Sequence, residues 1–141
     1  MKDFYVTFTA EGSANGRENT PARFSVPVPW LGTLEGFWEC ALVEISLDCL
    51  FSPKSDRLYL CCDAAEPNVI NDRRVQLLRN VETRGRYGKY LNENYQIPRY
   101  VGVSKRGKEH AEFYCLGADL EPVEFSSGTL HGVLHVRRRT T

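Results

Sequence analysis

The chain has 141 residues, of which 42% are apolar, 26% charged and 11% aromatic, and its formal net charge is zero. This balance is typical of a soluble folded domain and excludes a disordered chain, which would be poorer in apolar residues. Residues 1–6 lack the features of a signal peptide, and no apolar run approaches the roughly 20 residues of a membrane-spanning helix. We therefore expect one domain, residues 1–141, made in the cytosol and without a membrane span.

The first two expected strands lie near the N-terminus. Residues 4–9 are aromatic, β-branched or Thr, a composition that favours a strand. Further along, Phe24, Val26 and Val28 alternate with a serine and two prolines. Because proline has no backbone N–H to donate to a neighbouring strand, we expect residues 24–28 at a sheet edge or at a strand end.

The strongest strand pattern covers residues 34–48. Trp38, Cys40 and Leu42 are two residues apart, and the alternation resumes after Val43 with Ile45 and Leu47, separated by acidic residues and a serine. A period of two is typical of a strand buried on one face. The change of phase at residues 42–43 predicts either a β-bulge or a turn between two short strands.

Five further strands follow at shorter intervals. They are expected at residues 57–62, 75–81, 99–103, 112–116 and 130–137. A polar loop is expected after residue 62, through Pro67 and Asn71, and a long surface loop at residues 82–96. No segment shows an apolar stripe of helical period. About eight strands predict an all-β fold, and the jelly-roll β-sandwich is the eight-stranded candidate, with an immunoglobulin-like sandwich as the alternative.

Several short segments, taken in order, resemble a known family. The densest is Leu34–Ile45, Leu-Glu-Gly-Phe-Trp-Glu-Cys-Ala-Leu-Val-Glu-Ile, and the others are Phe4–Thr7, Asn19–Thr20, Phe24–Val26, Val75–Arg79, Tyr100–Val101, Val123–Gly128 and Leu134–Arg138. Their order and spacing resemble the capsid-type proteins of Polinton (Maverick) elements and the related adintoviruses. Two positions depart from the family pattern. Residues 46–48 stand where the family has a Tyr-Pro step, and the ending Leu-His-Val-Arg replaces Leu-His-Phe-Arg.

The resemblance implies a structural virion protein with a jelly-roll fold, made in the host cytoplasm and assembled inside the host cell into an icosahedral shell. One sandwich rather than two points to the minor, vertex-forming (penton) capsid protein, which would be a pentamer. The implied partners are further copies of the chain and the major capsid protein of the same particle. Two alternatives stay open: a cement or fibre-base module of the same virion, and a β-sandwich protein that binds nucleic acid.

The charges are distributed unevenly along the chain. Residues 1–72 carry 5 basic and 11 acidic side chains, residues 73–108 carry 10 and 2, and residues 109–141 carry 3 and 5. The basic middle segment is suited to nucleic acid or to an acidic surface of a neighbouring copy. Its candidate contact residues, in which cations alternate with rings that can stack on bases, are Arg84, Arg86, Tyr87, Lys89 and Tyr90.

Two other groups are candidate contacts. Arg137, Arg138 and Arg139 are expected to form a flexible basic tail, which in a capsid could reach genomic DNA. Trp30 follows a proline in a turn-like segment and is a candidate interface residue, since tryptophan and arginine dominate interface hot spots. Trp38, by contrast, is expected in the core.

No set of residues points to catalysis. His131 and His135 are four apart and would share a strand face, but no third or fourth metal ligand is evident, so we interpret them as polar residues packed against a neighbour. The five cysteines show no Cys-x-x-Cys spacing and are expected to be reduced core residues. We therefore expect a non-enzymatic protein without a cofactor or metal.

Overall fold

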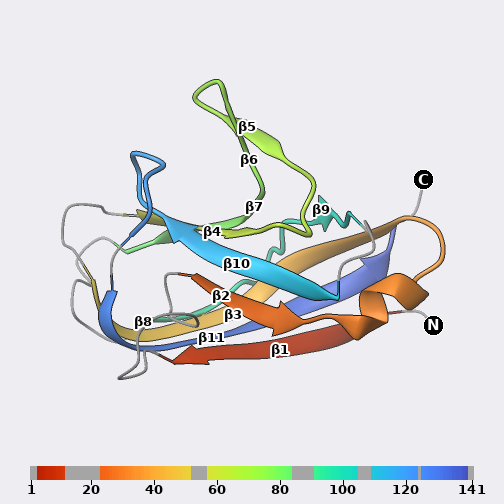
Figure 1. Cartoon of the computed structure of the whole chain (residues 1–141), viewed down its shortest axis with the longest axis horizontal. Helices are drawn as coiled ribbons and strands as arrows, with labels where there is room; N and C mark the ends of the chain where they lie inside the picture. Colours follow the sequence, from red (N-terminus) through yellow and green to blue (C-terminus); the bar gives the residue numbers. More distant parts are fainter. Residues whose placement is uncertain are drawn as a thin grey trace.

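Two antiparallel sheets pack face to face as a β-sandwich (Figure 1). The computed structural model describes residues 3–11, 23–51, 57–83, 91–104, 109–123 and 125–139. We call the two sheets A and B. Sheet A consists, in spatial order, of β1 (Asp3–Glu11), β11 (Phe125–Arg138), β3 (Trp38–Phe51) and β8 (Leu91–Asn94). Sheet B consists of β2 (Arg23–Pro27), β10 (His110–Leu116), β4 (Arg57–Cys62) and β7 (Leu77–Glu82).

The pairing of these eight strands is that of a jelly roll. The first strand, β1, pairs with the last, β11, and the second, β2, pairs with the last but one, β10. The same nesting continues inward, because β3 pairs with β8 and β4 with β7. The pairs β11–β3 and β10–β4 then complete the two sheets. The predicted single jelly-roll sandwich of about eight antiparallel strands is therefore confirmed.

Four short elements lie outside this framework. The two-residue strand β9 (Val101–Gly102) pairs with β3. The strands β5 (Asn68–Ile70) and β6 (Arg73–Val75) form a separate hairpin, which rises above β4 and β7 in Figure 1. A 3₁₀-helix, η1 (Pro29–Thr33), follows β2.

The phase change in the strongest strand is a β-bulge. Leu134 pairs with Leu42 and the preceding residue, Val133, pairs with Glu44, so Val43 is the extra residue of β3. The bulge lets Leu42 and Ile45 both point into the core, where each is at most 1% exposed. The sequence left open a bulge or a turn, and the continuous strand Trp38–Phe51 decides for the bulge.

The core is built from the inward-facing residues of both sheets. Phe8 of sheet A packs against Phe24 and Phe113 of sheet B, with ring centroids 4.6–5.7 Å apart. Aromatic pairs at this separation add to the hydrophobic stabilisation of burial. Gly132, the partner of Phe8 in the β1–β11 register, leaves the space that the Phe8 ring fills. Trp38 is 4% exposed, as expected from the sequence.

Two of the expected loops contain strands. The polar segment through Pro67 and Asn71 forms the β5–β6 hairpin, because Asn71 and Asp72 both adopt positive φ and make a tight turn. The expected surface loop 82–96 contains β8, whose Leu91 is fully buried. The other part of that loop, residues 84–90, lies outside the described residues. The strand expected at 99–103 is only two residues long.

Four cysteines, Cys40, Cys61, Cys62 and Cys115, are free thiols buried in the sandwich, as expected; the side chain of Cys49 is not described. Among the described strands, β2 pairs with β10 alone, which confirms the edge position predicted from its prolines. In the described part of the chain, no helix is long and apolar enough to cross a membrane.

Candidate functional site

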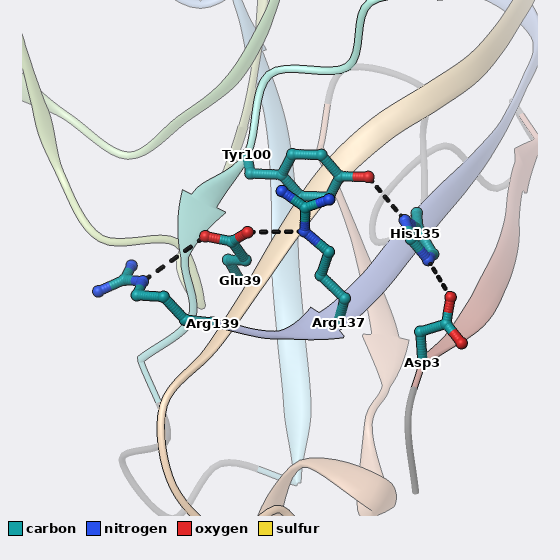
Figure 2. A network of polar contacts seen from close by, with 6 residues as sticks. All are labelled: Asp3, Glu39, Tyr100, His135, Arg137 and Arg139. Carbon is teal, nitrogen blue, oxygen red and sulfur yellow. Dashed lines mark hydrogen bonds and ion pairs between the residues drawn. The ribbon is translucent and has the colours of Figure 1, made fainter. Parts of the chain in front are cut away.

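A cluster of polar side chains lies on the outer face of sheet A, at the end where β11 finishes (Figure 2). We call it the outer cluster and define it by Asp3, Glu39, Tyr100, His135, Arg137 and Arg139. Its positions follow from the strand period. Leu134 and Val136 point into the core and are buried, so His135 and Arg137 point outward.

His135 joins two segments that are far apart in the chain. Its Nε2 lies 2.7 Å from the carboxylate of Asp3 and its Nδ1 lies 2.7 Å from the hydroxyl of Tyr100. Because a carboxylate only accepts hydrogen bonds, Nε2–H donates to Asp3, and a second hydrogen bond joins Nδ1 to the Tyr100 hydroxyl. The ring of Tyr5 stacks on the imidazole at a centroid distance of 4.8 Å. Both ring nitrogens of His135 therefore have partners.

Arg137 and Arg139 share one carboxylate. The Nε of Arg137 donates to Oε2 of Glu39 at 2.7 Å, and the Nε of Arg139 lies 3.6 Å from Oε1 of the same residue. The guanidinium carbon of Arg137 lies 3.4 Å from the ring centroid of Tyr100, a cation–π contact. Arg139 also lies 3.5 Å from the carboxylate of Glu66. The outer cluster thus links β1, β3 and β11 to the segment before β9.

Gly102 makes room for the outermost of these ion pairs. A Cβ atom at this position would collide with the guanidinium of Arg139 and with the carboxylate of Glu66. The backbone of Gly102 also accepts a hydrogen bond from the Glu66 N–H at 2.9 Å. The absence of a side chain therefore lets the Arg139–Glu66 pair cover β9.

The expectation of a flexible basic tail at residues 137–139 is wrong. Arg137 and Arg138 are the last residues of β11 and pair with Glu39 and Trp38 of β3. The backbone N–H of Arg139 donates to the carbonyl of Phe37 at 2.8 Å. The physical reason is that the β3–β11 ladder continues to the start of β3, so these arginines are held as strand residues.

Arg138 is not part of the outer cluster. It is exposed and lines a polar pocket of about 170 Å³ together with Thr33, Leu34, Glu35 and Trp38. The pocket lies beside Gly36, whose φ of +84° is a conformation that favours glycine. Among the described residues, no ion pair or side-chain hydrogen bond occupies the Arg138 guanidinium.

Trp30, the other predicted interface residue, lies in η1 and is half-buried. Its ring meets the ring of Phe4 edge-on at a centroid distance of 5.2 Å. It also lines an apolar cavity of about 20 Å³ between the sheets. Much of the Trp30 side chain is thus engaged within its own chain, and its exposed part is what remains for a partner.

The remaining predicted contact residues, Arg84, Arg86, Tyr87, Lys89 and Tyr90, lie outside the described residues. The structure therefore brings Arg137 and Arg139 together and separates Arg138 and Trp30 from them. The sequence did not single out Asp3, Glu39 or Tyr100. Glu39 follows the buried Trp38 in an alternating strand, so the sequence indicated that its side chain points outward but not which residues it contacts.

The two histidines behave as the sequence predicted. His131 and His135 lie on the same face of β11, and Nδ1 of His131 is 3.0 Å from the Thr9 hydroxyl. Both are polar strand residues that contact a neighbouring strand. In the described part of the chain, no group of three or more His, Cys, Asp and Glu side chains is arranged to hold a metal ion.

The buried thiols are poor nucleophiles. Burial raises the pKa of Cys40 from 9.0 to about 12, and burial likewise raises the pKa of Cys61 to about 12. A thiol reacts as the thiolate, so neither residue is activated near neutral pH.

Comparison of the sequence with protein families and with curated proteins finds no match.

Proposed function

We propose that this protein is a minor, vertex-forming capsid protein of the Polinton and adintovirus type, which acts by assembling with copies of itself and with a major capsid protein. The proposed function is non-enzymatic. It rests on the ordered segments that resemble this family, above all Leu34–Ile45, and on the strand order of the sandwich.

The strand order is the observation that carries the proposal. The orders β1-β11-β3-β8 and β2-β10-β4-β7 describe a jelly roll, an architecture that viral capsids use repeatedly. A fold alone does not define a function, so the family resemblance supplies the second argument. The two agree, because that family is expected to have this fold.

The edge of sheet B at β2 is protected against strand addition, which favours contacts through faces there. Edge strand β2 ends at Pro27, which cannot donate a hydrogen bond to a new strand. At the same edge, Arg23 pairs with Glu112 and lies over the ring of Tyr114, 5.5 Å from its centroid. Charged side chains and proline protect a sheet edge against pairing with other chains. Neighbouring copies would then meet through side chains on the outer faces and loops.

Solution mass tests the proposal. The purified chain should be measured by light scattering over a concentration series, alone and mixed with the major capsid protein of the same element, with negative-stain imaging of the same fractions. A closed ring of five copies, in either sample, is the expected result. A chain that stays monomeric in both samples would overturn the vertex function. Binding to DNA that weakens steeply with salt would then favour the nucleic-acid alternative.

A further inference from the structure

The β5–β6 hairpin, residues 68–75, is a small arm with exposed cations. Arg73 and Arg74 are both exposed, and neither takes part in an ion pair or side-chain hydrogen bond with any described residue. With Asp72 in the turn, the arm carries a net charge of +1. Val69, the cross-strand partner of Arg74, is 69% exposed. Since cross-strand partners point to the same side, Val69 and Arg74 form an exposed apolar and cationic pair.

The arm is fixed to the sandwich from its other side. Ile70 and Val75 pack with Cys61 of β4 and with Leu120 in a small apolar cluster on the outer face of sheet B. Its turn is tight, since Asn71 and Asp72 have φ values of 48° and 64°. Such a turn matches the twist of a two-residue hairpin. Val69 and Arg74 are therefore presented at a defined position.

The outer face of sheet A carries carboxylates that match these cations. Ile45 and Leu47 of β3 point into the core, so Glu44, Ser46 and Asp48 point outward. Neither Glu44 nor Asp48 has an ion pair or side-chain hydrogen bond with a described residue. We call Glu44, Ser46 and Asp48, with their neighbour Val133 of β11, the acidic face.

The arm and the acidic face cannot meet within one molecule. The arm packs on sheet B and rises above β4 and β7 in Figure 1, whereas β1 and β11 of sheet A lie on the opposite side of the sandwich. A contact between two different surfaces of identical chains is heterologous, and such contacts close into rings when the rotation is suitable. A neighbouring copy can therefore supply what each surface lacks.

We infer that the arm of one copy docks on the acidic face of the next, with Arg74 toward the carboxylates of Glu44 and Asp48 and with Val69 toward Val133. Arg73, the cross-strand partner of Ile70, lies on the other side of the arm and adds to its positive charge. The inference deepens the proposed function and rests on it, because it names the surfaces through which copies join. Charge complementarity selects a second copy as the partner. Opposite charges across an interface speed association and fix its register.

Charge reversal tests the contact. The variants Arg73→Glu with Arg74→Glu, and Glu44→Lys with Asp48→Lys, each turn the attraction into repulsion. We expect each to weaken self-association by at least about tenfold, measured by sedimentation velocity over a concentration series at low salt. The chain with all four substitutions restores opposite charges and should associate as the natural chain does.

Matched controls separate this contact from a general effect of charge. Arg99→Glu is compared with Arg74→Glu alone, because the two variants change the net charge equally and Arg99 is an exposed arginine elsewhere. Glu109→Lys with Glu121→Lys changes the net charge as the acidic-face variant does. Both controls should associate like the natural chain. Circular dichroism of every variant verifies that the fold is kept, and the substituted side chains all lie on the surface.

The outcomes distinguish this inference from the proposed function. If the natural chain forms rings and both reversal variants form them equally well, the arm contact is overturned while the vertex function stands. Failure of the four-substitution chain to associate would likewise overturn the charge pairing. A natural chain that stays monomeric at every concentration, even with the major capsid protein, would overturn both.

Discussion

Replacing Gly132 by alanine should destabilise the sandwich, because the site has no room for a methyl group. A Cβ atom at Gly132 would lie 2.8 Å from Cε2 and 3.1 Å from Cε1 of Phe8, and closer still to Cζ. The Phe8 ring is 4% exposed and packs against Phe24 and Phe113, so it has little freedom to move away. Forcing extra volume into a packed core costs about 1–3 kcal/mol.

A second effect opposes this cost. Alanine loses less backbone entropy on folding than glycine, which returns roughly 0.5–1 kcal/mol. Two ring atoms of Phe8 would lie closer to this Cβ than real Cβ contacts allow, so the steric cost should fall in the upper part of its range, about 2–3 kcal/mol. The net loss expected for Gly132→Ala is therefore about 1–2.5 kcal/mol. At roughly 2–4 °C for each kcal/mol in a protein of this size, the melting temperature should fall by about 2–10 °C. Urea unfolding followed by tryptophan fluorescence measures the free-energy difference.

A double-mutant cycle isolates the steric part. Phe8→Leu shortens the side chain above Gly132, so Gly132→Ala should cost less in that background than in the natural chain. The substitution Gly32→Ala is a control for the entropy of glycine, since a Cβ at Gly32 would meet no atom within 4 Å. A Gly132→Ala protein as stable as the natural one, or costs that simply add in the cycle, would refute the steric argument.

Three further predictions concern ionisation, the outer cluster and a strained turn. The pKa of Cys40 and of Cys61 is about 12 in the folded protein and 9.0 in the unfolded chain. The unfolded state therefore gains stability by ionising above pH 9. The contribution of these thiols to folding stability is complete below pH 9 and falls as the pH rises toward 12. Urea unfolding between pH 8 and 10.5 should show the decline, and Cys40→Ala should make it shallower; an identical slope would contradict the assignment. Glu39→Gln removes the carboxylate that Arg137 and Arg139 share. Because the Arg137 side chain is 44% exposed, the cost should be about 1 kcal/mol or less and smaller in 1 M salt. If Glu39→Gln lowers the free energy of unfolding equally at low salt and in 1 M salt, the Arg137–Glu39 ion pair does not stabilise the fold electrostatically. Gly36→Ala should lower stability by about 1–2 kcal/mol, since φ at Gly36 is +84°, and a melting temperature that does not change would argue against strain there.

The sequence predicted the framework because strand periodicity is a local signal. The change of phase beside Val43 was readable since inward residues on both sides of it keep their apolar character. The edge position of β2 was readable because proline removes a donor wherever it stands. These features need no knowledge of distant residues.

Local sequence signals could not predict the arm or the outer cluster. The strands β5 and β6 have three residues each, too few for an alternation to be visible between polar neighbours. Asp3 and His135 are 132 positions apart, and only the pairing of the first strand with the last brings them together. Residues 137–139 read as a tail by composition, whereas the length of the β3 ladder decides their structure.

The central position of β11 in sheet A bears on how the protein is made. This strand follows every other described strand in the chain, yet it fills the gap between β1 and β3. While the ribosome is still elongating, both of those strands would have an open edge, and the sheet could not close. Long-range pairings of this kind fold slowly. Synthesis itself would thus delay folding until β11 has emerged, so that a partly translated chain has no finished surface to offer to a neighbour.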